Sequence, residues 1–330
     1  MNTAGLAKVE LHLHLEGAAP PAFIRTIAGE KGLDISRIFT PDGAYEYRDF
    51  LQFLEIYEVA TSALQSPEDF ARLVGAVLAE SAAHGVVYTE AFLSPDFCGG
   101  RDVGAWLEYS AAMHEAAQQA EKAHGIAMRG VITAIRHFGP DKARETARCA
   151  QESAGDWITG FGIAGDENAG ELADFAYAFD MAREAGLGLT AHAGEWRGPE
   201  EVAAALDHLR VTRIGHGVRA IEDAALVQRL ADHGVVLEVC PGSNVTLGVF
   251  DSLRAHPITD LRAAGVPVTV STDDPPFFHT DLSREYAGLA DAFGWDEADF
   301  RAINLTAAAA AFCDEATRAR VVEKLEKSHV

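Results

Sequence analysis

The chain is poor in cysteine and in basic residues, and each shortage excludes a class of protein. Its 330 residues include 4 cysteines with no CxxC pair, so we expect neither a disulfide framework nor a thiolate zinc site. Lys and Arg number 27 against 50 Asp and Glu, and the net charge of -23 would repel a nucleic-acid backbone or an anionic membrane. We therefore expect neither nucleic acid nor a membrane as a partner.

Long apolar runs are also missing. No stretch reaches the roughly 18 consecutive apolar residues that mark a membrane-spanning helix. The first residues, MNTAGLAKVELHLHLEG, contain no apolar core of the kind a secretory signal needs. Together with the free thiols, these observations lead us to expect a cytoplasmic protein.

Eight short runs rich in β-branched and apolar residues recur along the chain, each followed by a stretch typical of a loop and an amphipathic helix. Such alternation predicts βα units and a parallel sheet. Eight units predict an α/β fold, a (β/α)₈ TIM-type barrel forming one domain over residues 1–330. The alternative, an open doubly wound sheet, normally carries a GxGxxG loop after its first strand, and this chain has HLHLEG there. The expected strands are 9–14, 86–93, 127–135, 158–164, 187–192, 212–216, 235–240 and 266–272.

The spacing between the first two expected strands departs from this rhythm. Roughly seventy residues separate them, far more than one crossover needs, which predicts a helical insertion at about residues 34–66. Within it, residues 45–64 (YEYRDFLQFLEIYEVATSAL) carry a thick apolar and aromatic face. Two interpretations stay open here: a second outer helix, or a lid over the barrel mouth that supplies apolar walls to a ligand pocket.

Histidines and an aspartate stand where apolar strands are expected to end. His12 and His14 lie two residues apart, so a strand places both side chains on one face. His192 ends the fifth strand and Asp273 follows the eighth. Three imidazoles and a carboxylate suit Zn²⁺, which lowers the pKa of a bound water toward about 7 and so supplies hydroxide for hydrolysis. We expect one Zn²⁺ per chain, held by these four residues.

Other polar residues at the same strand ends suggest acid–base chemistry. Glu195, three residues after His192, is expected to protonate a substrate nitrogen, although a charge at a helix N-terminus is the alternative. His216, in RIGHG, would orient and deprotonate the water together with Asp273. Asp274 is free to hydrogen-bond a heterocycle nitrogen. The end of the fourth strand offers no lysine to bridge two metals, since residues 162–166 are GIAGD.

At these residues the sequence resembles the adenosine deaminase family of the amidohydrolase superfamily. Six motifs follow one another in the family's order through nearly the whole chain: VELHLHLEG, FGIAGDE, HAGE, RIGHG, EVCPGSN and VTVSTDDPPFF. The resemblance implies a mononuclear zinc barrel that replaces the 6-amino group of a purine with oxygen and releases ammonia. It implies the same ligands, Glu195 as proton donor to N1 and Asp274 at N7. It also implies that the backbone of Gly165 approaches N3, where a residue without Cβ is needed.

One position departs from the adenosine-specific pattern. Glu16 stands where those members typically have an aspartate that contacts the ribose, and members acting on adenine or on modified nucleosides also have HLHLEG. The stretches EVCPGSNVTLGV and STDDPPFFHT nevertheless look most like bacterial members called adenosine deaminases. We therefore expect deamination of adenosine and 2′-deoxyadenosine to the inosine product in purine salvage. Adenine, or a modified nucleoside such as aminodeoxyfutalosine, is the alternative substrate.

Two rivals belong to other classes. A different amidohydrolase reaction, such as opening a cyclic amide or an ester, would use the same zinc hydroxide without needing Glu195 as a donor to a ring nitrogen. A barrel that only binds a purine or a partner would lack a ligand or an acid–base group, yet every position is filled. The oligomeric state is left open.

Overall fold

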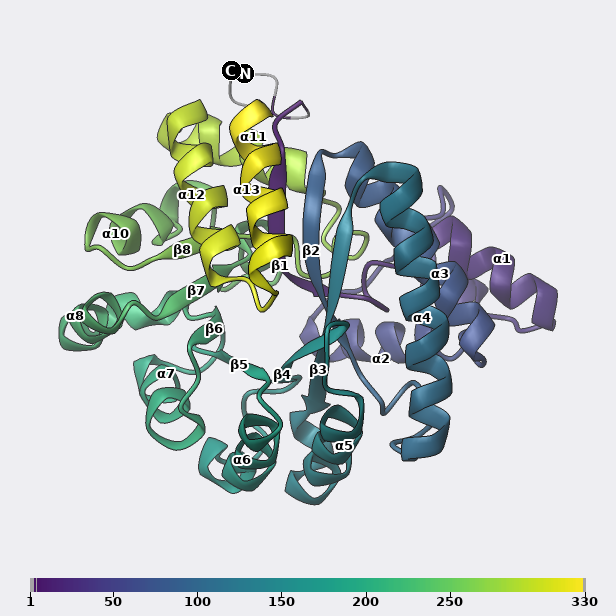
Figure 1. Cartoon of the computed structure of the whole chain (residues 1–330). Helices are drawn as coiled ribbons and strands as arrows, with labels where there is room; N and C mark the ends of the chain where they lie inside the picture. Colours follow the sequence, from purple (N-terminus) through teal and green to yellow (C-terminus); the bar gives the residue numbers. More distant parts are fainter. Residues whose placement is uncertain (1–2, 4, 329–330) are drawn as a thin grey trace.

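The computed structural model describes residue 3 and residues 5–328, and in it eight parallel strands run in chain order through one sheet with helices around them (Figure 1). The sheet closes between its first and last strands, because the backbone N–H of His14 donates to the carbonyl of Asp273 at 3.0 Å and that of Asp273 to the carbonyl of His12 at 3.1 Å. The fold is the expected (β/α)₈ barrel. Its strands are β1 (Lys8–His14), β2 (Val86–Leu93), β3 (Ala127–Ile135), β4 (Ile158–Ala164), β5 (Gly188–Ala193), β6 (Arg213–His216), β7 (Val236–Val239) and β8 (Val268–Val270).

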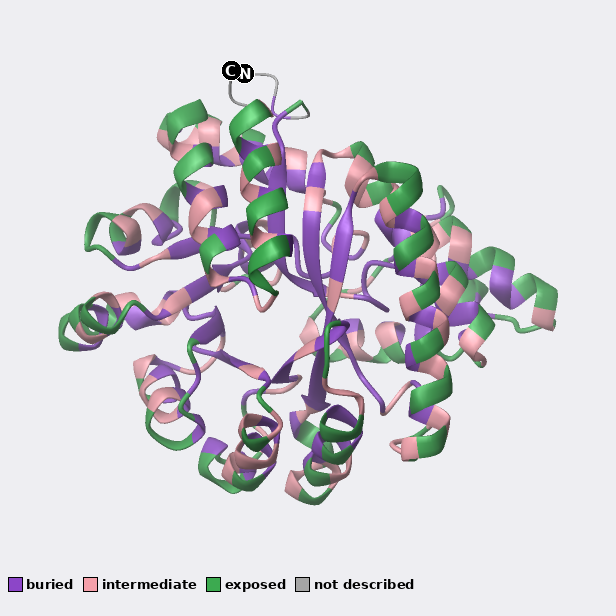
Figure 2. Ribbon diagram, viewed as in Figure 1, coloured by how far each residue is buried: buried purple, intermediate pink, exposed green. Residues whose placement is uncertain are grey.

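The helices form the outer layer, with buried faces toward the strands and exposed faces toward solvent (Figure 2). Several begin with a residue that satisfies the unpaired N–H groups of the first turn; Ser66 and Asp69, for example, form a reciprocal capping box on α3. The helices are α1 (Pro21–Lys31), α2 (Phe50–Thr61), α3 (Pro67–Ala83), α4 (Val103–His124), α5 (Pro140–Ser153), α6 (Ala176–Glu184), α7 (Pro199–Ala204), α8 (Ala224–His233), α9 (Pro241–Thr246), α10 (Ile258–Ala263), α11 (Leu282–Phe293), α12 (Glu297–Ala310) and α13 (Glu315–Ser328).

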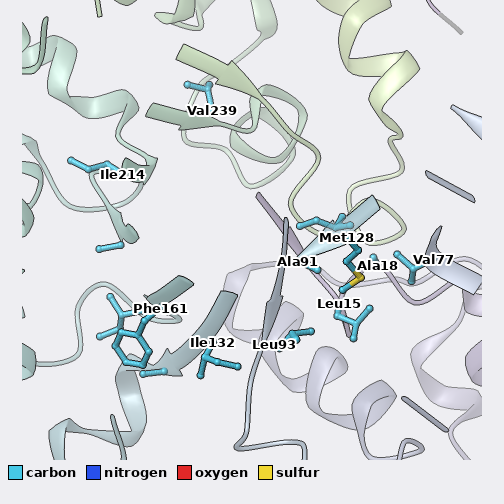
Figure 3. Close-up of a cluster of buried hydrophobic side chains, with 14 of the residues drawn as sticks. Leu15, Ala18, Val77, Ala91, Leu93, Met128, Ile132, Phe161, Ile214 and Val239 are labelled. Carbon is cyan, nitrogen blue, oxygen red and sulfur yellow. The ribbon is translucent and has the colours of Figure 1, made fainter. Parts of the chain in front are cut away.

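The main core combines strand side chains such as Ile132, Phe161 and Ile214 with helix side chains such as Val77 (Figure 3). All four are at most 3% exposed, and full burial of such a side chain stabilises the fold by about 1.5–3 kcal/mol. A second cluster joins the beginnings of β1 and β2 to α12 and α13. These two clusters of side chains hold in place the strands whose ends carry the polar residues.

The insertion between β1 and β2 differs in detail from the expected one. It contains α1, the short 3₁₀ turn η1 (Ser36–Ile38), α2 and α3. The helix expected at 45–64 begins only at Phe50, because Tyr45 pairs with Phe39 in an antiparallel bridge and stacks on Phe277 at 4.0 Å between ring centroids. Asp49 then caps α2 by accepting from the N–H of Gln52.

Strands β7 and β8 are shorter than expected. The chain turns into α9 directly after Cys240, and it leaves β8 after Val270 so that Asp273 can pair with β1. Among the described residues, none of the helices is both long and apolar enough to cross a membrane.

Candidate functional site

Four side chains from three strand ends bring their ligand atoms to one spot. His12 and His14 end β1, His192 lies in β5, Asp273 follows β8, and one ligand atom from each lies within 4.8 Å of all the others. Oδ1 of Asp273 is 3.4 Å from Nε2 of His12 and 3.3 Å from Nε2 of His14. The structure therefore places the four predicted metal ligands together at the carboxyl ends of the strands.

The chemistry of this donor set fits a divalent cation. The buried Nε2 of His12 has no hydrogen-bond partner among the described residues, and the Nε2 atoms of His14 and His192 are only 3.1 Å apart. Burial and the neighbouring histidines hold the pKa of His192 well below its usual value, so its ring is neutral, the form that binds metals. A cation would satisfy these converging nitrogens.

Neighbouring side chains orient two of these ligands. Nδ1 of His12 donates to Oε2 of Glu238 at 2.9 Å, which leaves Nε2 free to face the ligand cluster. The hydroxyl of Ser243 donates to Oδ2 of Asp273 at 2.7 Å. Such partners fix the tautomer and the rotamer of metal ligands.

The backbone at the site is strained. His216 and Asp273 have φ angles of 58° and 69°, in the left-handed region that costs a residue with Cβ of order 1–3 kcal/mol. The surrounding fold maintains both conformations, and both residues face the same cluster.

A second group of possible ligands, His216, Cys240 and Asp273, also lies within 4.8 Å. Burial raises the pKa of the Cys240 thiol well above its usual value, whereas the thiolate is the metal-binding form. The group of three histidines and one aspartate offers four ligand atoms against three, and it is the better metal site.

The predicted acid–base residues lie beside this cluster. Oε2 of Glu195 is 3.7 Å from Nε2 of His216, and that nitrogen is 3.9 Å from Oδ2 of Asp273. Burial, with the charges of Asp273 and Glu167, raises the pKa of Glu195 well above its usual value. Burial also lowers the pKa of His216 to about 3. Burial thus favours the protonated form of the Glu195 carboxyl and the neutral form of the His216 imidazole.

These residues open into a cavity of about 90 Å³. Phenylalanine and tyrosine rings form part of its wall, and α2 supplies one side with Phe50, Phe53, Leu54 and Tyr57. Pockets for drug-sized ligands enclose roughly 300–1,000 Å³, so this one suits a single small heterocycle. The other lining residues are His14, Glu58, Ser94, Phe97, Ile135, His137, Ala164, Gly165, His192, Glu195, His216, Leu247, Asp273, Asp274 and Phe278.

The predicted substrate-binding residues occupy different places around this cavity. Asp274 and Gly165 line it, and Oδ1 of Asp274 is buried without a hydrogen-bond partner among the described residues. Gly165 has a φ of +102°, which favours glycine, and an added Cβ would lie 2.8 Å from Nδ1 of His137. Glu16 lies behind the wall, where its Oε2 accepts from the hydroxyl of Tyr57 at 3.4 Å.

Sequence reasoning missed several residues that support the site. Glu238, Ser243 and Asn244 all belong to the EVCPGSN motif, and Glu167 belongs to FGIAGDE. The amide nitrogen of Asn244 lies 3.4 Å from Oε1 of Glu195 and 3.2 Å from Nδ1 of His216. A charged residue inside the buried run VVLEVC was the available signal for Glu238, but the sequence alone does not name its partner.

Comparison with known proteins identifies the family. A family model described as adenosine deaminase matches residues 7–328. The chain belongs to the adenosine deaminase family. It is accordingly an enzyme of a family of hydrolytic deaminases within the amidohydrolase superfamily.

Relatives that are about 50% identical to this chain are named for one activity within the family. A protein named adenine deaminase from Chelativorans sp. is 51% identical over 97% of this chain and 98% of its own. Another of that name from Agrobacterium fabrum is 48% identical over 98% of this chain and 99% of its own. These relatives overturn the adenosine assignment made from the sequence, which rested on the wording of two motifs; Glu16 was the better indicator.

Solved structures agree with the fold and with a metal centre. A crystal structure described as adenine deaminase from Arthrobacter aurescens has a TM-score of 0.88 and 29% identity, covering 98% of both chains. An amidohydrolase from Burkholderia ambifaria, described with bound Zn, has a TM-score of 0.85 and 26% identity over 99% of this chain and 92% of its own.

Proposed function

We propose that this chain is a zinc-dependent adenine deaminase that converts adenine and water to hypoxanthine and ammonia. The observation that carries the proposal is a convergence on one small cavity: a four-residue metal site, the buried carboxyl of Glu195, and an oxygen of Asp274 that has no hydrogen-bond partner among the described residues. The full-length relatives named adenine deaminase support the choice of base. We take residues 1–330 as one catalytic domain.

The lining of the cavity favours the free base over a nucleoside. A planar purine ring would pack against the Phe and Tyr side chains of the lining. Helix α2 closes this space on one side. The hydroxyl of Tyr57, on that helix, contacts Glu16 and so occupies the space next to the Glu16 carboxylate. A ribose on N9 would need additional volume and polar partners for its hydroxyl groups.

We infer that the metal is Zn²⁺, held by His12, His14, His192 and Asp273. Three nitrogens and one carboxylate oxygen are a set that Zn²⁺ prefers. A bound Zn²⁺ would lower the pKa of a water molecule toward about 7 and make hydroxide available at neutral pH. His216 and Asp273, with Nε2 and Oδ2 3.9 Å apart, would hold this water and receive its proton.

The remaining residues act on the purine. Glu195 would donate its proton to N1, which draws electron density from C6 and promotes attack by the water oxygen. Asp274, whose pKa burial and the Asp273 charge raise well above the usual value, would hydrogen-bond N7. The proton that His216 took from the water would pass to the 6-amino nitrogen, and the bond from C6 to that nitrogen would break to release ammonia. The hydroxyl on C6 would return a proton to Glu195 as it becomes the carbonyl of hypoxanthine. The backbone of Gly165 would lie against N3, where a side chain would collide with His137.

Product identification tests the proposal. The zinc-loaded enzyme should release hypoxanthine and ammonia from adenine in equal amounts, and Glu195→Gln should keep zinc and adenine binding while kcat falls about 10²- to 10⁴-fold. Hydrolysis of a lactam or ester without ammonia from any 6-aminopurine would refute it.

A further inference from the structure

The loop that carries Glu195 is held by a carboxylate from another strand. Glu167 follows β4 and is 1% exposed. Its Oε1 accepts from the backbone N–H of Glu195 at 3.2 Å, and its Oε2 accepts from the N–H groups of Trp196 and Arg197 at 2.9 and 2.6 Å. Three consecutive amides thus converge on one buried side chain.

This arrangement is a backbone nest filled by a side chain rather than by a free anion. Hydrogen bonds to an ionised acceptor are roughly twice as strong as neutral ones. Without the carboxylate, three N–H groups would lose their partners, and a buried unpaired donor is destabilising. The loop between β5 and α7 therefore depends on Glu167 for its conformation.

A buried arginine forms hydrogen bonds both to the segment of Glu167 and to the helix that follows the loop of Glu195. Arg136, which is 2% exposed, donates to the carbonyl oxygens of Ala169 and Gly170, each at 2.8 Å. Its third bond, 2.7 Å long, goes to Oε1 of Glu201 on α7. The segment that carries Glu167 and the helix that follows Glu195 are therefore tied to the same side chain.

We propose that Glu167 is a positioning residue that sets the carboxyl of Glu195 for proton transfer. The proposal rests on the proposed function, since it assigns Glu195 the role of acid. Glu167 does not itself line the cavity, and its side chain bonds the main chain of the loop, that of Glu195 included. Displacement of a reacting group by about 1 Å costs on the order of 10²-fold in rate, so a relaxed loop would slow the chemistry more than it weakens binding.

Glu167→Gln tests this with little change in shape. One oxygen becomes an NH₂ group that faces the donating amides, so at least one of the three bonds is lost. We expect kcat for adenine to fall about 10- to 100-fold, with KM changed less than about threefold and zinc stoichiometry retained. Amide hydrogen exchange at residues 195–197 should become faster.

Glu171→Gln is the matched control. The carboxylate of Glu171 belongs to the same segment but is 71% exposed. It contacts the side chain of Arg197 at 3.3 Å and caps the short 3₁₀ turn that begins at Leu172, and it makes none of the contacts of Glu167 to the loop amides. Its kcat, KM and exchange rates should equal those of the unchanged protein. Glu167→Asp serves as a second variant, since it keeps the charge but shortens the reach, and it should show a smaller loss of kcat than Glu167→Gln.

The outcomes separate the two proposals. If the unchanged protein releases no ammonia from adenine, the proposed function fails, while hydrogen exchange still reports whether Glu167 holds the loop. Faster exchange with an unchanged kcat would overturn the positioning role. Loss of zinc or a global fall in Tm in both Glu167 variants would also overturn it, because Glu167 would then be a residue that maintains the fold.

Discussion

Replacing Glu238 with glutamine is expected to weaken zinc binding although the side chain keeps its shape. The carboxylate accepts from Nδ1 of His12 at 2.9 Å, from Thr190 at 2.9 Å and from Nε of Arg213 at 2.6 Å, and the side chains of Glu238, His12 and Arg213 are at most 1% exposed. Every partner is a donor. Glutamine has one acceptor oxygen, so its NH₂ group must face either the metal ligand or the arginine.

The expected magnitude follows from these contacts. Removing one partner of a buried ion pair costs about 3–5 kcal/mol, and we expect the lower end because Arg213 keeps Glu90 at 2.7 Å. Loss of a residue that orients a metal ligand lowers metal affinity about 10- to 100-fold, which equals roughly 1.4–2.8 kcal/mol. Urea unfolding of the metal-free protein measures the first quantity, and competition with a chelator measures the second.

Glu222→Gln provides the matched control, since the side chain of Glu222 is 45% exposed and pairs with Arg219 at the surface. Exposed pairs contribute about 0–1 kcal/mol, so neither measurement should change much. A Glu238→Gln protein with the zinc affinity of the unchanged enzyme would show that this carboxylate does not orient His12.

Four other perturbations give separate expectations. A chelator should abolish adenine turnover and lower the Tm, because a ligand of the folded state adds RT ln(1 + [L]/Kd) to stability; full turnover after metal removal would contradict the ligand set. Phe53→Ala enlarges the cavity, so kcat/KM for adenosine relative to adenine should rise about tenfold, or 1.4 kcal/mol; a constant ratio would exclude α2 from substrate choice. Gly17→Ala places a Cβ 1.5 Å from Oδ1 of Asp274, so KM for adenine should rise while zinc content stays, and a normal KM would argue against Asp274 as a ligand of the base. Burial raises the pKa of Glu285 from 4.5 to about 7, so its stabilisation is complete below pH 4.5 and is lost as the pH rises through 7. We therefore compare the unfolding free energies of Glu285→Gln and the unchanged protein at each pH. Their difference should shift by about 3 kcal/mol in favour of the variant between pH 4.5 and pH 8, and parallel pH curves from urea unfolding would contradict this.

Periodicity within a strand explains why part of the site was predictable. His12 and His14 share a face because strand side chains alternate, and the carboxyl ends of parallel strands must meet at one rim of a barrel. These two rules brought His192 and Asp273 to the same place before any contact was known. The left-handed φ of Asp273 and its bonds to β1 were not visible, because they depend on how the barrel closes.

The remaining features depend on contacts between segments far apart in the chain. Glu238 and Glu167 act on residues of other strands, and no spacing rule gives those pairs. The placement of α2 sets the size of the cavity, and it puts Tyr57 between Glu16 and the ligand space. We attribute the proposed preference for adenine to this packing. The motifs that suggested adenosine contain Leu247, Phe277 and Phe278, but the motifs alone do not show how α2 packs against them.

The most direct test is the ratio of kcat/KM for adenine to that for adenosine, measured with the zinc-loaded enzyme in one assay of ammonia release. The cavity predicts a ratio of at least about 100 in favour of adenine, equivalent to roughly 2.8 kcal/mol of transition-state binding. Equal or better turnover of adenosine would contradict the proposed function and the role given to α2.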